Sequence, residues 1–262
     1  MITSVSNAKV KQVVLWQGKS RERKKDGVFL AEGIKMFGEA PVDWIREAYV
    51  TEAACEKLRQ SPETKGKLDQ IPWEMVSDEV MEKMADTQTP QGIITILKRP
   101  EYRLETFLDD PRGLFLILED LQDPGNLGTI MRTSEGAGVT AVILSKTTVD
   151  IFNPKTIRAT MGSIYRMPFI FADDLKDIMQ IMKEKQVQTF AAHLSGTTYY
   201  TGHSFQKPTA FLIGNEGNGL SEEITKMADF FIKIPMEGKL ESLNAAVAAA
   251  LLIYEAKRQR SL

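Results

Sequence analysis

The fold is indicated by residues 113–138, which read GLFLILEDLQDPGNLGTIMRTSEGAG. Residues 113–120 begin with the apolar run GLFLIL and predict a buried strand, and the Asp-Pro-Gly at residues 123–125 predicts a turn. Residues 126–138 have helical spacing and end in glycine, which is typical of a helix C-terminus. The stretch therefore predicts a strand, a turn and a helix. Asn126 is placed to cap this helix, and Arg132 lies nearly two turns further along it.

The same alternation of strands and helices continues to the C-terminus. We predict strands in residues 140–145, 167–172, 188–194, 209–216 and 229–236, and helices in residues 154–163, 173–186, 221–228 and 242–260. Ser221 is expected to cap the third of these helices. Apolar strands that alternate with helices are typical of a parallel sheet covered on both faces. Residues 113–262 are therefore predicted to form an α/β domain.

The N-terminal part of the chain predicts a second, smaller α/β domain. We expect helices in residues 7–19, 33–41, 52–60 and 78–86, and strands in residues 27–32, 44–51, 71–77 and 91–99. Asp78 is available to cap the last of these helices. Residues 100–112 contain proline at two positions and acidic residues without a sustained period, which favours a linker. The predicted domains are thus 1–99 and 113–262, joined by residues 100–112.

Composition excludes several classes of protein. The chain has 262 residues, 43% of them hydrophobic, which is ordinary for a globular protein of two domains. No run of eighteen apolar residues predicts a membrane span, and residues 1–12 lack the apolar core of a secretory signal, so we expect a cytoplasmic protein. Cys55 is the single cysteine, which excludes an internal disulfide. His193 and His203 are the only histidines, which argues against a zinc site.

Positive charge is concentrated at the N-terminus. Residues 1–25 hold seven Lys or Arg against one Glu, a local charge of +6, although the whole chain carries −2. Such an asymmetry is found in nucleic-acid-binding arms, so Lys19, Arg21, Arg23 and Lys24 are candidate phosphate contacts. A solvated helix end without a partner is the simpler interpretation.

Two more loops follow predicted strands and carry unusual residues. Residues 213–223, IGNEGNGLSEE, contain three glycines that allow close approach of a ligand to the backbone. The phosphate-binding patterns G-x-x-x-x-G-K-[ST] and G-x-G-x-x-G are absent, which disfavours an NTPase, a dinucleotide-dependent oxidoreductase and a Rossmann-type methyltransferase. Residues 234–250 include Ser242 and Asn244 at the start of an alanine-rich helix. Taken singly, these loops could be a surface turn and an N-capped core helix.

Together, the three loops resemble the motifs of a known family. The motifs are Asn126-L-G-T-I-M-Arg132, then L-I-G-N-Glu216-G-N-G-L-S, then I-P-M-E-G-K-L-E-Ser242-L-Asn244-A-A-V-A. Their order and spacing resemble the SpoU, or TrmH, branch of the SPOUT RNA 2′-O-ribose methyltransferases. The third motif often has serine where this chain has Ala246. The stretch R-E-R-K-K-D-G-V-F-L-A-E-G resembles the RNA substrate-binding domain attached to such enzymes, which is related to some ribosomal proteins.

The resemblance implies a fold and a reaction. The C-terminal domain would contain a deep trefoil knot that holds S-adenosylmethionine, and the protein would be a homodimer with the active site near the subunit interface. The reaction would be methyl transfer to a ribose 2′-hydroxyl of structured RNA, most often 23S ribosomal RNA. A tRNA 2′-O-methyltransferase and a non-catalytic RNA-binding or ribosome-assembly protein of the same fold remain as alternatives.

The resemblance also implies roles for individual residues. Arg132 would grip an RNA phosphate and assist the 2′-hydroxyl, while Asn126, Ser242 and Asn244 orient the ribose and Glu216 fixes Arg132 by an ion pair. The methyl donor would be held largely by backbone groups, and the candidates are Gly214, Glu216, Ile234, Leu243 and Leu194. A guanidinium is almost always protonated, so a phosphate clamp is the simpler role for Arg132 than a general base.

Overall fold

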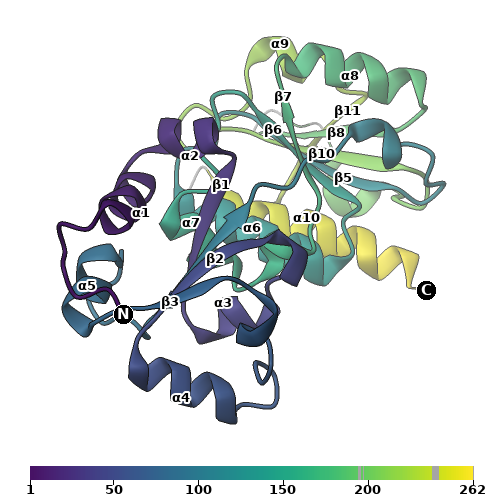
Figure 1. Cartoon of the computed structure of the whole chain (residues 1–262). Helices are drawn as coiled ribbons and strands as arrows, with labels where there is room; N and C mark the ends of the chain where they lie inside the picture. Colours follow the sequence, from purple (N-terminus) through teal and green to yellow (C-terminus); the bar gives the residue numbers. More distant parts are fainter. Residues whose placement is uncertain (194–195, 197, 238–241, 262) are drawn as a thin grey trace. The chain divides into compact units, whose positions relative to one another are not determined.

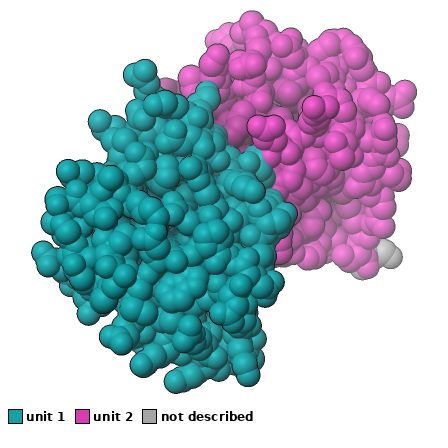
Figure 2. All heavy atoms as spheres, in the orientation of Figure 1, with its two compact units in different colours: residues 1–100, 150–165 teal, residues 101–149, 166–262 magenta. Residues whose placement is uncertain are grey.

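The computed structural model describes residues 1–193, 196, 198–237 and 242–261 (Figure 1). Contacts divide the chain into two compact units, which Figure 2 distinguishes by colour. Unit 1 comprises residues 1–100 and 150–165, and unit 2 comprises residues 101–149 and 166–262. The first crossing lies beside the predicted boundary at residue 99. The prediction did not foresee that residues 150–165 would join unit 1.

Unit 1 is built on a four-stranded sheet in the order β1-β4-β2-β3. Its strands are β1 (Val28–Glu32), β2 (Ile45–Val50), β3 (Trp73–Met75) and β4 (Ile93–Lys98). The pairs β1/β4 and β2/β4 are antiparallel, whereas β2/β3 is parallel. The helices are α1 (Ala8–Gly18), α2 (Ser20–Asp26), α3 (Ile34–Glu39), α4 (Glu52–Gln60), α5 (Asp78–Met84) and α7 (Pro154–Thr160). Short 3-10 helices lie at Val42–Trp44, Leu68–Gln70 and Ser163–Tyr165.

Helices α1 and α5 form the main core of unit 1 with the sheet. Val13 and Trp16 of α1 pack with Met81 of α5 against Leu30 and Ile96. Helix α5 is capped by Ser77, whose hydroxyl accepts from the N–H of Val80, so the prediction of Asp78 as the cap was wrong. Serine and aspartate can both cap a helix. Ser77 is the cap here because it directly precedes the first helical residue, Asp78.

Residues 150–165 complete a second part of this unit. Phe152 is 1% exposed, and its ring centroid lies 5.0 Å from that of Phe29 on β1. The guanidinium of Arg99 lies 4.2 Å from the Phe152 ring centroid on the same patch. Helix α7 also packs on β1. The segment therefore belongs to the hydrophobic core of unit 1.

Unit 2 contains a seven-stranded sheet in the order β7-β6-β5-β10-β8-β11-β9, and every neighbouring pair is parallel. The strands are β5 (Leu114–Leu118), β6 (Ala141–Ser145), β7 (Phe169–Ala172), β8 (Gln188–Ala192), β9 (Thr198–Tyr199), β10 (Thr209–Ile213) and β11 (Phe230–Lys233). The predicted parallel α/β architecture is confirmed. The two-residue strand β9 was not predicted.

Helices cover both faces of this sheet (Figure 1). Helices α6 (Pro124–Ala137) and α10 (Ala245–Arg260) pack together on one face, and α8 (Leu175–Glu184) and α9 (Glu222–Met227) lie on the other. Short 3-10 helices occupy Leu104–Thr106 and Tyr200–Gly202. Ser221 caps α9 as predicted, because its hydroxyl accepts from the N–H of Ile224. No helix within the described residues is long and apolar enough to cross a membrane.

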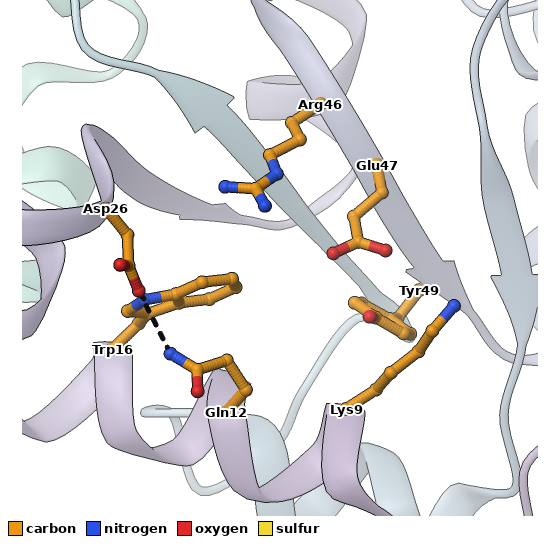
Figure 3. A pocket seen from close by; sticks show the side chains of 7 residues that line it. All are labelled: Lys9, Gln12, Trp16, Asp26, Arg46, Glu47 and Tyr49. Carbon is orange, nitrogen blue, oxygen red and sulfur yellow. Dashed lines mark hydrogen bonds between the residues drawn. The ribbon is translucent and has the colours of Figure 1, made fainter.

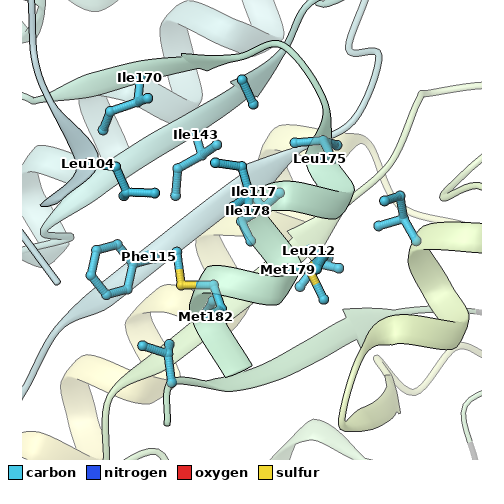
Figure 4. Packing of buried hydrophobic residues seen from close by; sticks show 14 of the residues in the cluster. Leu104, Phe115, Ile117, Ile143, Ile170, Leu175, Ile178, Met179, Met182 and Leu212 are labelled. Atoms are coloured by element: carbon cyan, nitrogen blue, oxygen red, sulfur yellow. The ribbon is translucent and has the colours of Figure 1, made fainter. Parts of the chain in front are cut away.

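The core under α8 explains why residues 100–112 are not a free linker. Alternate residues of a strand share one face, so Phe115 and Ile117 of β5 both point toward Met182 and its neighbours on α8 (Figure 4). Leu104 and Leu108 are buried in the same cluster. Residues 101–112 are therefore part of unit 2, and the apolar residues between the prolines are the reason.

Candidate active site

The loops that leave β5 and β10 form the centre of the site. These strands are parallel neighbours, with Leu118 paired to Ile213, so the loops after them emerge side by side. In parallel α/β sheets, ligands bind beyond the carboxyl ends of the strands. The predicted motifs at residues 118–138 and 213–223 are therefore adjacent, although about ninety residues separate them in the chain.

The loop after β10 is a tight turn fixed by glycine. Asn215 and Gly219 exchange two backbone hydrogen bonds of 3.0 and 2.9 Å, and Gly219 has φ of +69°, which favours glycine. A Cβ on Gly214 would lie 2.0 Å from the carbonyl carbon of Gly219. Glycine at these two positions therefore has a steric reason.

Asn215 holds this turn to the loop after β5. Its side-chain amide donates to the carbonyl of Asp120 at 2.8 Å, and its Oδ1 accepts from the N–H groups of Gly217 and Asn218 at 2.8 and 3.0 Å. Glu119 accepts from the N–H and the hydroxyl of Ser221 at 2.8 and 2.7 Å. No role was predicted for Glu119 and Asn215. Their position directly after buried parallel strands is the signal that could have found them.

Glu216, Asn126 and Asn244 form one chain of hydrogen bonds. The amide of Asn126 donates to Glu216 Oε1 at 3.1 Å, and the amide of Asn244 donates to Asn126 Oδ1 at 2.8 Å. Asn244 also caps α10 by accepting from the N–H groups of Ala246 and Val247. Three predicted residues, each from a different motif, are thus brought together, and both ends of the Asn126 amide are fixed.

The Glu216 carboxylate stabilises the turn before α6. Its two oxygens accept from the backbone N–H groups of Gln122 and Asp123, each at 3.0 Å. Burial alone would raise the pKa of Glu216, but these hydrogen bonds and the one from Asn126 outweigh it and lower the pKa below its ordinary value. Glu216 is therefore a charged anchor at neutral pH rather than a proton donor.

Two predictions about this loop were wrong. Helix α6 begins at Pro124 and is capped by Asp123, whose carboxylate accepts from the N–H of Asn126 at 2.7 Å. Asn126 is therefore inside the first turn, because proline at the first helical position starts the helix earlier. The predicted ion pair between Glu216 and Arg132 is also not formed. The Glu216 carboxylate instead accepts hydrogen bonds from residues at the start of α6, nearly two turns away from Arg132.

Arg132 lies on α6 with its side chain exposed. Within the described part of the chain, it forms no hydrogen bond or ion pair. A guanidinium without a protein partner keeps all its donors for a ligand. The structure is thus compatible with the predicted phosphate clamp.

A hollow of about 620 Å³ lies beside the hydrogen-bond chain, between α6 and α10. It is lined by Asn126, Thr129 and Thr133 of α6, by Asn244, Ala246, Val247, Ala250, Leu251, Tyr254 and Glu255 of α10 and its cap, and by Tyr200. Val247, Leu251 and Tyr254 are 48%, 37% and 47% exposed, at spacings that place them on one face of α10. The asparagines therefore lie at the polar end of a partly apolar surface.

The remaining candidates for binding the methyl donor lie after β11 and before α10. Ile234 directly follows β11, and Leu243 precedes Asn244; both are half-buried. Ser242 is exposed beside them. Leu194 lies outside the described residues. Half-buried apolar side chains and a glycine turn suit a ligand with a planar apolar ring that is bound through backbone groups.

The basic N-terminal residues do not all face solvent. Lys19, Arg21 and Lys24 are exposed, as predicted for phosphate contacts. Arg23 is 3% exposed and donates to the carbonyl of Trp16 at 2.6 Å and to the carboxylate of Asp150 at 2.6 Å. The prediction of Arg23 as an RNA contact was wrong, because a residue 127 positions away in the sequence binds its guanidinium.

Comparison with known proteins identifies the family. Residues 113–254, more than half of the chain, match the SpoU rRNA Methylase family. The chain belongs to this family. Residues 7–95 match the MRM3-like substrate binding domain. The predicted family of RNA methyltransferases is therefore confirmed, and with it the enzyme class.

Individual family members resemble the chain over nearly its whole length. The 23S rRNA (guanosine(2553)-2′-O)-methyltransferase RlmP of Bacillus subtilis is 32% identical over 256 residues, which cover 97% of each chain. The 23S rRNA (uridine(2479)-2′-O)-methyltransferase of Streptomyces viridochromogenes is 26% identical, covering 97% of this chain and 91% of that one. The crystal structure of an AdoMet-bound rRNA methyltransferase from Sinorhizobium meliloti has a TM-score of 0.88 and 30% identity, covering 98% of this chain and 97% of that one.

Proposed function

We propose that the protein transfers a methyl group from S-adenosylmethionine to a ribose 2′-hydroxyl in 23S ribosomal RNA. The observation that carries this proposal is the hydrogen-bond chain from Glu216 through Asn126 to Asn244. It joins the three family motifs at the carboxyl edge of the parallel sheet. A site for small ligands is expected at this edge, and the exposed Arg132 stands on the same helix as Asn126.

The residues at this edge fit the methyl donor. When bound, S-adenosylmethionine supplies an electrophilic sulfonium methyl group. The tight turn at Gly214 would bring the backbone close to the methyl donor, and Ile234 and Leu243 would offer apolar cover. The Glu216 side chain is occupied by the turn before α6, so this residue would act toward the donor only through its backbone.

The protein's own side chains would position the RNA. Arg132 would bind a phosphate of the target nucleotide through its planar fork and stabilise negative charge that develops on the 2′-oxygen. Asn126, Asn244 and Ser242 would orient the ribose, and Glu216 would keep Asn126 in the required rotamer. The always protonated guanidinium makes Arg132 a clamp rather than the acceptor of the hydroxyl proton.

Unit 1 supports ribosomal RNA over transfer RNA as the substrate. The MRM3-like substrate binding domain makes up residues 7–95, and the two relatives named as 23S rRNA methyltransferases share this part of the chain. The exposed Lys19, Arg21 and Lys24 of this unit would contact phosphates around the target. A cytoplasmic location is part of the same proposal, because bacterial ribosomal RNA would be reached there.

A trefoil knot and a homodimer complete the proposal. In the knot, the last segments of the chain would thread through an earlier loop, and the methyl donor would be held there. The second copy would cover the exposed face of α10 formed by Val247, Leu251 and Tyr254, beside Asn126 and Asn244. Apolar residues at the centre and polar residues around them are typical of subunit interfaces. Sedimentation equilibrium of the wild type and of Leu251→Asp tests this part.

Methyl transfer to ribosomal RNA is the decisive test. Wild-type protein with labelled S-adenosylmethionine should methylate ribosomal RNA from a strain that lacks the gene, at a 2′-O position that reverse transcription at low nucleotide concentration identifies. Arg132→Ala should lower the rate by about 100-fold or more, as the loss of a charge-stabilising donor does elsewhere. Arg103→Ala, an exposed arginine of the same unit, is the control.

Donor binding separates the alternatives. Calorimetry should give Arg132→Ala nearly the wild-type affinity for S-adenosylmethionine, because Arg132 acts on the RNA. Lost donor binding in a folded Arg132→Ala protein would overturn its assignment. A wild-type protein that does not bind the donor would favour a non-catalytic RNA-binding protein, and methylation of transfer RNA alone would favour the tRNA alternative.

A further inference from the structure

Unit 1 contains a hollow that the proposed reaction does not use. It has a volume of about 500 Å³ and lies between α1 and β2 (Figure 3). The lining residues are Lys9, Gln12 and Trp16 from α1, Asp26 from the end of α2, and Arg46, Glu47 and Tyr49 from β2. All seven belong to unit 1. An aromatic ring, a guanidinium and a carboxylate in one hollow suit a ligand that is both planar and polar.

The floor of the hollow is rigid. Trp16 is 4% exposed, and its Nε1 donates to Asp26 Oδ2 at 2.7 Å. Gln12 Nε2 donates to the same oxygen at 3.2 Å. Both donors bind the same oxygen of Asp26, so the carboxylate and the indole hold each other in place at the floor of the hollow.

Glu47 is the group that can accept hydrogen bonds from a ligand. Its carboxylate points into the hollow, between the rings of Trp16 and Tyr49 (Figure 3). Burial, followed by the negative charge of Glu47, raises the pKa of Tyr49, so the phenol stays protonated beside this carboxylate. An ionised carboxylate accepts about four hydrogen bonds, so one phenol leaves most of its capacity free.

Arg46 can stack on a planar ligand. Its side chain is exposed, and its guanidinium carbon lies 5.8 Å from the Trp16 ring centroid. Within the described part of the chain, Arg46 forms no ion pair. Guanidinium planes of this kind stack on unpaired RNA bases.

We propose that this hollow binds one unpaired guanine of the RNA, with its N1–H and N2–H donated to Glu47 and its plane stacked on Arg46. This inference rests on the proposed function, because it assumes an RNA substrate. Guanine is favoured because its Watson–Crick edge offers two adjacent donors to one carboxylate, whereas the edges of adenine, cytosine and uracil mix single donors with acceptors.

The charges around the hollow favour RNA over a basic peptide. Lys9 and Arg46 stand at its rim, and the adjacent Lys24 and Lys25 precede Asp26 with exposed side chains. These cations would attract the phosphates on either side of a bound base and repel lysine or arginine side chains. The positive charge of Lys9 is partly neutralised by an ion pair with Glu74.

The test uses the full-length protein and short synthetic RNA. Anisotropy would compare three labelled heptamers that consist of uridine except at the central position, which is guanosine, inosine or uridine. Inosine lacks the N2 amine and so removes one of the two donors. Wild type should bind the guanosine heptamer about tenfold more tightly than the uridine heptamer, with inosine between them.

Two substitutions carry the assignment, and each has a matched control. Glu47→Gln keeps an acceptor for Tyr49 but turns one oxygen into a donor, so it should abolish the preference for guanosine. Arg46→Ala should weaken binding of all three heptamers. The exposed residues Glu56 and Arg59 of α4 provide the controls Glu56→Gln and Arg59→Ala. A spectrum of circular dichroism checks that each variant is folded.

Each other outcome overturns the inference. Equal affinity of wild type for the three heptamers would mean that the hollow does not read a base. A preference for the guanosine heptamer that persists in Glu47→Gln would mean that another part of the protein recognises the base. Displacement of the guanosine heptamer by pentalysine, lost in Glu47→Gln but kept in Glu56→Gln, would make a protein segment the ligand. Methyl transfer to ribosomal RNA, measured on the same wild-type preparation, tests the proposed function separately.

Discussion

Replacing Asp150 with alanine tests the ion pair that attaches residues 150–165 to unit 1. The carboxylate accepts from the hydroxyl of Ser20 at 2.7 Å, from Arg23 Nη2 at 2.6 Å and from the N–H of Phe152 at 3.0 Å. The side chain of Arg23 is 4% exposed and that of Asp150 21%. Removing one partner of a buried pair costs about 3–5 kcal/mol, and the partial exposure of Asp150 places the expected loss near the lower end, about 3 kcal/mol.

Urea unfolding followed by tryptophan fluorescence is the suitable assay. Trp16, Trp44 and Trp73 are the three tryptophans of the chain, and all belong to unit 1. Asp86→Ala is a matched control, because Asp86 pairs with Arg158 of the same segment at a more exposed position and should cost under about 1 kcal/mol. If Asp150→Ala destabilised unit 1 no more than Asp86→Ala, the assignment of the buried pair would be refuted.

The same pair predicts a dependence on pH. Burial alone would raise the pKa of Asp150, but the hydrogen bonds from Ser20 and Arg23 and the charge of Arg23 hold it below the ordinary value of 3.8. A carboxyl group whose pKa is lowered by folding stabilises the protein above its unfolded pKa, and this stabilisation is lost as the pH falls through the folded value. The difference in unfolding free energy between wild type and Asp150→Ala should therefore be constant near neutral pH and shrink below about pH 4.

Three further predictions concern binding and catalysis. Neutralising Lys19, Arg21 and Lys24 together should lower the salt dependence of RNA affinity, by up to about one unit of slope per phosphate contact, and an unchanged slope would make this cluster an ordinary solvated surface. Gly214→Ala should weaken S-adenosylmethionine binding more than tenfold in calorimetry, because the added Cβ would lie 2.0 Å from the Gly219 carbonyl carbon. The control Gly217→Ala should bind the methyl donor normally, because its Cβ would meet only Asn215 Oδ1 at 3.5 Å. Glu216→Ala should lower the single-turnover rate of methyl transfer by about tenfold or more with little change in affinity for the methyl donor, because it frees the turn before α6 and the Asn126 amide. A normal rate would show that the hydrogen-bond chain is not needed for catalysis.

Local pattern was sufficient to predict most helices and strands of both units. Apolar runs such as residues 114–118 and periodic runs such as residues 175–184 indicate their own secondary structure. Strand β9 has two exposed residues, and α2 consists almost entirely of charged and polar residues, so neither has a hydrophobic pattern to detect. The unit to which α7 belongs depends on contacts with β1, which no local pattern contains.

The loops of the candidate site were predictable because they follow strand ends, and the site residues within them were identified from the family resemblance. Asn126, Glu216 and Asn244 were identified as members of one site, and their side chains do meet. Which groups pair within it was not predictable, because several polar side chains compete for the same turn and only the geometry selects Asp123 as the cap. The burial of Arg23 could not be predicted from the local charge count, because its partner Asp150 lies 127 residues away in the sequence.

The attachment of residues 150–165 to unit 1 has a consequence for how the protein folds during its synthesis. The first hundred residues contain all four strands of unit 1 but not Phe152, which is 1% exposed and packs against Phe29 and Arg99. A nascent chain therefore exposes this apolar surface until residue 165 has left the ribosome, when β5 and β6 of unit 2 have also emerged but β7 to β11 have not. A protein fragment cut at residue 100 would carry the same exposed surface permanently, and neither half should be as soluble or as stable as the intact chain.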